Sequence, residues 1–176
     1  MRDKQEERDR EPNPCQSLAP YGKKATRGPR GLINSFRFAG RGFLYCVKNE
    51  RNMRIHLTAV FYVLLFSTFY DFEPGQYAVL LLVFGLALVA EMVNTAIEVL
   101  CDMLSPKYSE AARIAKDVAA GAVFVSAVVA VAVAMIYFFD MEVLRRIWNY
   151  FLGHAVAAVM LLLSFIFAFF FIRAKK

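Results

Sequence analysis

The chain has 176 residues, of which 59% are hydrophobic, with a formal net charge of +6 and a mean hydropathy of +0.44. This length allows one domain, and the apolar content, with 17 Phe, argues against an ordinary soluble protein and favours an integral membrane protein. Thirteen of the 21 Lys and Arg residues lie within residues 1–54, which favours attraction to an anionic membrane surface. No base-stacking motif accompanies this charge, so we expect no nucleic-acid partner.

The amino-terminal part of the chain is polar and then amphipathic. Residues 1–30 carry many charges and prolines and predict a disordered basic cytoplasmic tail. Residues 31–52 predict an amphipathic helix, in which Leu32 and Phe36 belong to an apolar stripe opposite a stripe of polar and basic residues. We expect this helix to lie on the membrane surface, the alternative being a helix packed on protein.

Four apolar segments follow and predict membrane-spanning helices, namely Ile55–Tyr70, Gln76–Leu104, Ala111–Phe139 and Trp148–Ile172. The expected fold is therefore all-α and integral to the membrane, with an amphipathic surface helix, three spans and a fourth, carboxyl-terminal span. Residues 140–176 are interpreted as an additional membrane segment with a basic tail. The basic residues collect on one side of such a four-span chain, which the positive-inside rule makes cytoplasmic. Arg145 and Arg146 are the discordant pair on the other side.

A stripe of polar residues interrupts the second span. Glu91, Asn94, Glu98 and Asp102 are separated by three or four residues, and this spacing brings side chains to one helix face. An ionised carboxylate near the centre of a bilayer costs at least about 2.5–3.5 kcal/mol. A metal ion, protons, a cationic partner or a water-filled cavity must therefore neutralise this stripe.

A second polar cluster opens the third span. If the second and third spans form a hairpin, Lys116 and Asp117 lie near Glu98 and Asp102. A lysine can hold a nucleotide phosphate, and carboxylates with an asparagine offer the oxygen ligands that Mg²⁺ prefers. Phosphoryl transfer needs little more than these groups and one that orients the attacking hydroxyl.

A further polar group lies at the junction of the surface helix and the first span. Glu50 is followed there by Arg51 and Arg54, which we interpret as anchors for a phosphate or a lipid headgroup. No glycine-rich phosphate loop of the Walker type occurs in the chain, so a nucleotide would be held by charge and metal. Taken singly, each of these polar residues could also be an interfacial or helix-packing residue.

These motifs resemble the small integral-membrane prokaryotic diacylglycerol kinase family, which includes the undecaprenol kinases. The resemblance rests on Ala90–Glu98 with Asp102 and on Ala115–Val123. The segments Asn49–His56 and Ser105–Tyr108 resemble the undecaprenol kinase branch. The resemblance as a whole covers roughly residues 32–139, and we interpret residues 31–139 as a lipid kinase domain.

The resemblance implies roles for the polar residues. Glu50 and Glu98 match the metal-coordinating pair, here for Mg²⁺, and Glu91 matches the base that takes the proton from the lipid hydroxyl. Asn94, Asp102, Lys116 and Asp117 match nucleotide-binding positions. The role of His56, at a position that is acidic in some relatives, is left open.

Two classes of function remain from the sequence. The first is a lipid kinase of the bacterial cytoplasmic (inner) membrane, a multi-pass protein with ATP, a lipid alcohol and the bilayer as partners. Undecaprenol is the expected acceptor and diacylglycerol the alternative, and the resemblance implies a homotrimer with sites shared between chains. The second is a small proton- or ion-conducting membrane protein that uses buried carboxylates as a relay.

Overall fold

The computed structural model describes residues 29–104 and 109–174. Residues 1–28 of the predicted tail and residues 105–108, which carry part of the resemblance to the undecaprenol kinase branch, lie outside this description. The chain divides into two units, residues 1–40 and 41–176. All the candidate site residues belong to the second unit.

The described residues form helices and no strand. The helices are α2 (Pro29–Asn49), α3 (Arg51–Ser67), α4 (Pro74–Leu104), α5 (Glu110–Phe138), α6 (Met141–Gly153) and α7 (Ala155–Arg173). In this part of the chain, α4, α5 and α7 are long and apolar enough to cross a membrane. The predicted all-α integral membrane fold is thus confirmed.

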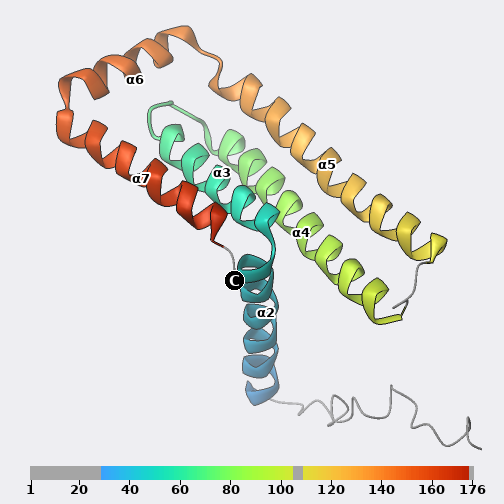
Figure 1. Cartoon of the computed structure of the whole chain (residues 1–176). Helices are drawn as coiled ribbons and strands as arrows, with labels where there is room; N and C mark the ends of the chain where they lie inside the picture. The colour runs from blue at the N-terminus through green and yellow to red at the C-terminus, as the bar shows by residue number, and fades with distance from the viewer. Residues whose placement is uncertain (1–28, 105–108, 175–176) are drawn as a thin grey trace, which may run out of the picture. The chain divides into compact units, whose positions relative to one another are not determined.

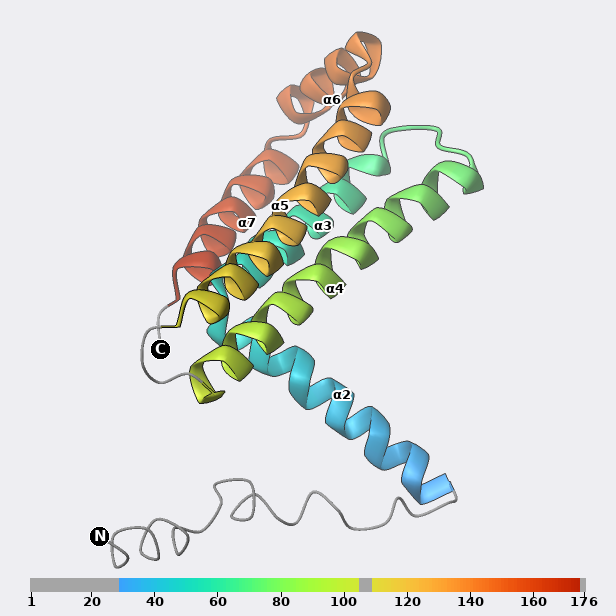
Figure 2. The ribbon, with the colours of Figure 1, turned by 90° about the vertical axis from the view of Figure 1, so that its right-hand side faces the viewer.

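The spans of the second unit pack side by side as an antiparallel bundle (Figure 1). Helices α4 and α5 form a hairpin with the most extensive contact, α3 packs on α4, and α7 packs on α3. The start of α3, the end of α4 and the start of α5 lie at one end of the bundle, as two perpendicular views show (Figure 2). Most of the polar residues predicted for the site lie at or next to these helix ends, and Glu91 lies farther along α4.

Helices α2 and α3 are separated by a single residue, Glu50. The prediction of one amphipathic helix over residues 31–52 is wrong at its end, because α2 stops at Asn49 and α3 begins at Arg51. Glu50 has an extended backbone, with φ −99° and ψ 123°, which no helix can accommodate. Helix α3 has 17 residues, or about 26 Å, and is shorter than the three span candidates.

Aromatic side chains close the opposite end of the bundle. The Tyr70 hydroxyl donates to the carbonyl of Phe138 at 2.7 Å, and the ring of Phe72 contacts Tyr70 and Phe138. These contacts join the turn after α3 to the end of α5 and hold the open end of the α4–α5 hairpin in place.

The prediction of one continuous span over Trp148–Ile172 is wrong. The Asp140 carboxylate accepts from the backbone N–H groups of Glu142 and Val143 and starts a separate helix, α6. That helix ends at Gly153. The next residue, His154, has a backbone that is not helical, and its ring Nδ1 hydrogen-bonds the carbonyl of Tyr150 at 2.8 Å. The span α7 therefore begins only at Ala155.

The discordant arginine pair is on α6. The Arg146 Nη2 donates to the carbonyl of Phe69 at 3.0 Å, just beyond the last residue of α3. A cation is favourable where the carbonyls at a helix end are unsatisfied. This structural role accounts for a basic residue on the side where the positive-inside rule disfavours one.

Candidate active site

The corner between α2 and α3 is held by Arg54. Its Nη1 donates to the carbonyls of Val47 at 3.2 Å and Lys48 at 3.0 Å, in the last turn of α2. Only 8% of Arg54 is exposed, and its Nε has no hydrogen-bond partner. Arg54 thus fixes the path of the chain around Glu50, and its sequence-based role as a phosphate or headgroup anchor stays a prediction.

Glu50 extends from this corner toward α4. The residue is the N-cap of α3, yet its side chain makes no capping hydrogen bond, so the carboxylate remains available. Burial raises the pKa of Glu50, the nearby Glu98 carboxylate raises it further, and the Arg54 guanidinium lowers it in part. The corner therefore brings a third acid to the stripe that α4 carries.

Glu91 is the deepest acid of the stripe. It is 1% exposed, and neither of its carboxylate oxygens has a hydrogen-bond partner. It interacts electrostatically with Glu50 and Glu98. We call these three residues the carboxylate cluster.

Asn94 adds a further oxygen donor to the carboxylate cluster. Its Nδ2 donates to Oε1 of Glu98 at 2.8 Å, while its Oδ1 is buried without a partner. Three acids beside an orphaned amide oxygen form a set of hard oxygen donors, which suits a divalent cation such as Mg²⁺. Among the described residues no group of three or more His, Cys, Asp or Glu side chains is arranged closely enough to hold a metal alone, so substrate oxygens would have to complete the shell.

The hairpin brings Lys116 of α5 to the end of α4, as the sequence predicts. The Lys116 ammonium forms an ion pair with Asp102 and interacts electrostatically with Glu98. The side chains of Lys116 and Asp102 are 36% and 71% exposed, so an incoming anion can reach the lysine. A phosphate near this pair would lie beside the carboxylate cluster.

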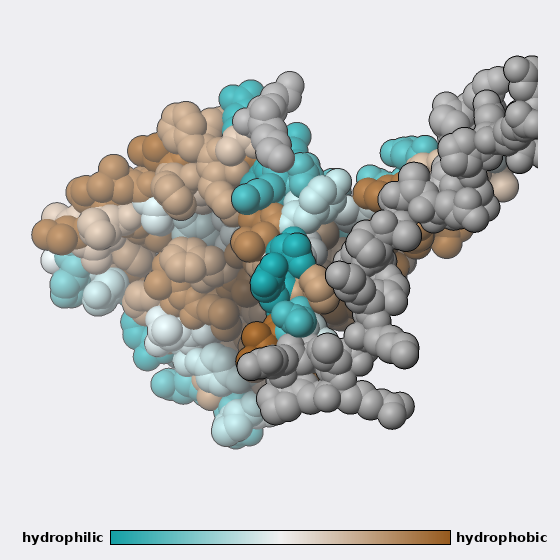
Figure 3. Space-filling model, turned by 90° about the horizontal axis from the view of Figure 1, so that it is seen from below, coloured by the Kyte–Doolittle hydropathy of each residue, from teal (hydrophilic) through white to brown (hydrophobic). Residues whose placement is uncertain are grey.

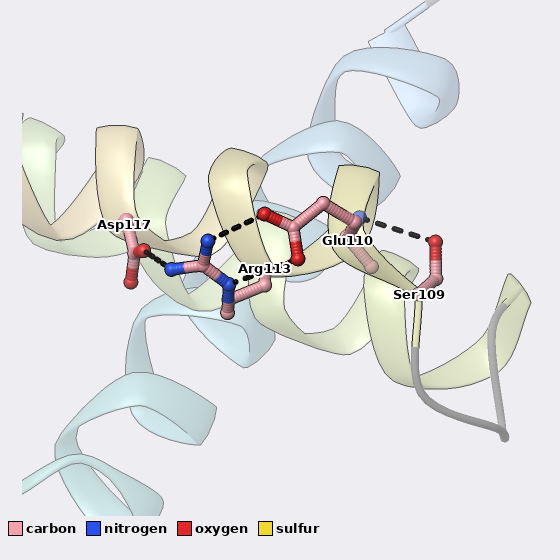
Figure 4. A network of polar contacts seen from close by, with 5 residues as sticks. Ser109, Glu110, Arg113 and Asp117 are labelled. Carbon is pink, nitrogen blue, oxygen red and sulfur yellow. Dashed lines mark hydrogen bonds and ion pairs between the residues drawn. The ribbon is translucent and has the colours of Figure 1, made fainter.

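Asp117, which we expected near Glu98 and Asp102, pairs with Arg113 instead. Its carboxylate accepts from Arg113 Nη1 at 3.1 Å, and Arg113 also pairs with Glu110 at 2.6 Å (Figure 4). Ser109 caps the same helix start by accepting from the N–H of Ala112. Asp117 thus belongs to an exposed network along the first turns of α5, and its nucleotide-binding role stays a prediction.

Two residues of the site were not singled out as functional by the sequence. Cys46, one turn before Glu50, is buried and hydrogen-bonds Thr95, which follows Asn94 on α4. Burial raises the pKa of the Cys46 thiol, and the hydrogen bond to Thr95 lowers it in part. For Thr95 the available signal was its spacing of four residues from Glu91, because such residues share a helix face, and its hydroxyl donates to the carbonyl of Glu91 at 3.0 Å.

The remaining predicted residue, Arg51, is exposed at the first position of α3. In the view onto the end of the bundle that carries the site, hydrophilic residues gather in the middle, with hydrophobic residues around them (Figure 3). The fold and the site together define a helical membrane protein with a buried carboxylate cluster that opens at one end of its bundle.

Comparison with known proteins identifies the family. The family described as prokaryotic diacylglycerol kinase matches residues 37–138, and the chain belongs to this family. The protein is an ATP-dependent lipid kinase of the multi-pass, inner-membrane type. The second class considered from the sequence, a proton- or ion-conducting membrane protein, is therefore excluded.

Three relatives illustrate the range of the family. A diacylglycerol kinase of Synechocystis is 38% identical over 115 residues, which cover 65% of this chain and 66% of the relative. An undecaprenol kinase of Bacillus subtilis is 35% identical over 107 residues, 61% of this chain and 87% of the relative. A diacylglycerol kinase of Pseudomonas aeruginosa is 30% identical over 110 residues, 62% of this chain and 89% of the relative. No solved structure matches the chain.

Proposed function

We propose that this lipid kinase transfers the γ-phosphoryl group of ATP to the hydroxyl of undecaprenol, with diacylglycerol as the alternative acceptor. The observation that carries the proposed chemistry is the buried Glu91 carboxylate, unpartnered and flanked by Glu50 and Glu98. A buried acceptor without a donor is costly, so such a group persists where a substrate supplies the donor.

Glu91 is the proposed general base. The hydroxyl of a lipid alcohol is a hydrogen-bond donor, and its tail can remain among the apolar residues around α4. The hydroxyl would donate to an unpartnered oxygen of Glu91, which takes the proton as the hydroxyl oxygen attacks the γ-phosphorus of ATP. The bond between that phosphorus and the oxygen that bridges to the β-phosphate breaks, and ADP leaves. Positioned proton transfer of this kind contributes about 10²–10⁴-fold to a rate.

Glu50 and Glu98 are the proposed metal ligands, with the Asn94 Oδ1 as a further oxygen donor. The hydrogen bond from Asn94 Nδ2 holds the Glu98 carboxylate in one orientation. A bound Mg²⁺ would neutralise charge on the phosphate oxygens during transfer. It would also offset the mutual repulsion of the carboxylate cluster.

Lys116 is the proposed phosphate ligand of the nucleotide. It is held in place by Asp102 and lies within electrostatic reach of Glu98. Asp102 thus acts by positioning the ammonium group, and Asp117 and Arg51 are proposed to contact the nucleotide from the exposed rim.

The choice of undecaprenol is supported by the residues Asn49–His56 and by the Bacillus subtilis undecaprenol kinase, which is 35% identical where the Pseudomonas aeruginosa diacylglycerol kinase, covered to a similar extent, is 30% identical. Diacylglycerol is supported by the Synechocystis relative, which has the higher identity over a smaller part of its length. Diacylglycerol carries two ester groups, which need polar partners or water near the site, and this requirement favours undecaprenol.

Side-by-side kinetics test this choice. We expect a higher kcat/KM for undecaprenol than for diacylglycerol when both are presented in mixed micelles at the same mole fraction. A clear preference for diacylglycerol would reverse the assignment of the acceptor and leave the roles of the carboxylates intact.

We also propose a homotrimer, in which α4 and α5 of neighbouring chains meet. A hollow of about 370 Å³ between α4 and α5 of the single chain is lined in part by small residues, Ala90, Gly121, Ala122 and Ser126. A Cβ atom added at Gly121 meets nothing within 4 Å in the single chain. Small residues allow close packing of helices in lipid.

The variant Gly121→Leu tests the assembly. It should disrupt the trimer, measured by cross-linking in detergent, and leave the helix content of the chain unchanged. Gly153→Leu is a matched control, because Gly153 also has open space around it and lies on α6, outside the two helices of the proposed interface. A wild-type chain that is active and strictly monomeric would contradict the proposal.

A mixing experiment tests whether neighbouring chains share the carboxylates. The resemblance implies sites shared between chains, in which case a mixture of Glu50→Gln and Glu98→Gln chains would regain activity. Since Glu50 and Glu98 interact within one chain, we expect the mixture to stay inactive instead. Recovery of activity in the mixture would show that one site takes its two metal ligands from different chains.

A further inference from the structure

Helix α6 carries a stripe of exposed apolar side chains. Met141, Leu144, Trp148 and Leu152 are spaced by three or four residues, which brings their side chains to one face. Each of these residues is between 41% and 68% exposed. Such a stripe is unfavourable in water and needs an apolar environment.

Another face of α6 packs on the bundle. The ring of Phe69, beyond the end of α3, contacts the rings of Tyr150 and Phe151 with centroid distances of 5.3 and 6.0 Å. The hydrogen bond from Arg146 to the Phe69 carbonyl lies at the same junction. These contacts fix the rotation of α6, so its apolar stripe is left facing outward.

A polar stripe borders the apolar one. Arg145 and Asn149 follow Leu144 and Trp148 by one residue each, which is about 100° of rotation, and both are exposed. Helix α6 therefore presents an apolar and a polar face side by side, the pattern of a helix at a membrane interface.

The position of α6 in the chain identifies what covers the stripe. The helix connects α5 to α7, and both are long and apolar enough to cross a membrane. At 13 residues it is about 20 Å long, too short to cross the bilayer, and it lies over the end of the bundle (Figures 1 and 2). The place where two spans end and begin is the bilayer surface.

We infer that α6 lies in the bilayer interface at the end of the bundle away from the carboxylate cluster. Its apolar stripe contacts phospholipid acyl chains close to the headgroups, where a tryptophan is also favoured. Arg145 and Asn149 point toward the headgroup region, in which an arginine can pair with phosphate. Through Arg146, the same helix holds the end of α3 at a defined depth. This inference does not depend on the acceptor lipid.

The single tryptophan of the chain makes the inference testable without a label. The full chain is reconstituted in vesicles of phosphatidylcholine and phosphatidylglycerol that contain phosphatidylcholine brominated either close to the headgroup or close to the chain ends. Trp148 emission should fall more with the shallow bromines than with the deep ones. The variant Trp148→Phe should abolish the signal.

Two reporter variants built on Trp148→Phe serve as matched controls. A tryptophan introduced by Leu163→Trp, at an exposed position within α7, should be quenched most by the deep bromines. One introduced by Asn149→Trp, on the polar stripe, should be quenched by aqueous iodide more strongly than Trp148. Retained kinase activity shows that each variant is folded.

Three outcomes would overturn the inference. Strongest quenching of Trp148 by deep bromines would place α6 inside the hydrocarbon core. Quenching by iodide without any effect of bromines would place the stripe in water. Protection from both quenchers would show that protein, such as a second copy of the chain, covers it.

Discussion

The substitution Glu91→Gln separates a catalytic role from a structural one, because the two roles predict opposite changes in stability. The carboxylate is 1% exposed, lacks hydrogen-bond partners and interacts with two other acids. Glutamine keeps the size of the side chain and removes the charge. If Glu91 only stabilised the fold, its replacement would lower stability and activity together.

The magnitudes follow from these surroundings. An unsatisfied buried polar group costs about 1–3 kcal/mol, and more when it is charged. Removing the charge should therefore leave the free energy of unfolding unchanged or raise it by about 1–3 kcal/mol, since an amide can also donate to Glu50 or Glu98. Loss of a general base should lower kcat by about 10²–10⁴-fold.

The assay combines ATP-dependent phosphorylation of the lipid in mixed micelles with unfolding of the same preparation by denaturing detergent. Glu73→Gln is the matched control, because Glu73 is an exposed acid just before α4, at the other end of the bundle. It should retain wild-type turnover. A Glu91→Gln protein with near-normal kcat would refute the reasoning, as would one that unfolds far more readily than the wild type.

Three further predictions follow from the contacts around the site. Lys116→Met should raise the KM for ATP with little effect on the KM for lipid, and it should change stability little, as expected for an exposed pair; an unchanged KM for ATP would remove Lys116 from the phosphate site. Arg54→Met should lower kcat and weaken the binding of Mg²⁺, because it removes the guanidinium whose Nη1 donates to two carbonyls of α2 and so holds the corner at Glu50; titration of activity with Mg²⁺ measures this, and wild-type metal dependence would contradict it. Deleting residues 147–176, which removes α7 and about half of α6, should lower the stability of the protein more than its kcat, since α7 packs on α3 and neither helix carries a residue of the carboxylate cluster; complete loss of turnover in a folded truncated chain would place the segment in the site.

The sequence by itself determines which segments can enter the membrane and which acids share a helix face. Both are local properties, because hydropathy over a window of residues and the helical repeat need no knowledge of distant contacts. The α4–α5 hairpin and the proximity of Lys116 to Asp102 could also be predicted, since a short connection forces neighbouring spans to be antiparallel.

The tertiary structure decides how the remaining groups meet. Glu50 joins Glu91 and Glu98 only because the chain turns at one extended residue and Arg54 holds the carbonyls of α2. The break at His154 depends on a local cap and on contacts of α6 with Phe69, some 80 residues earlier, so hydropathy alone merged the two helices. Side chains at a helix end choose among several partners of similar energy, and only packing in three dimensions selects one of them.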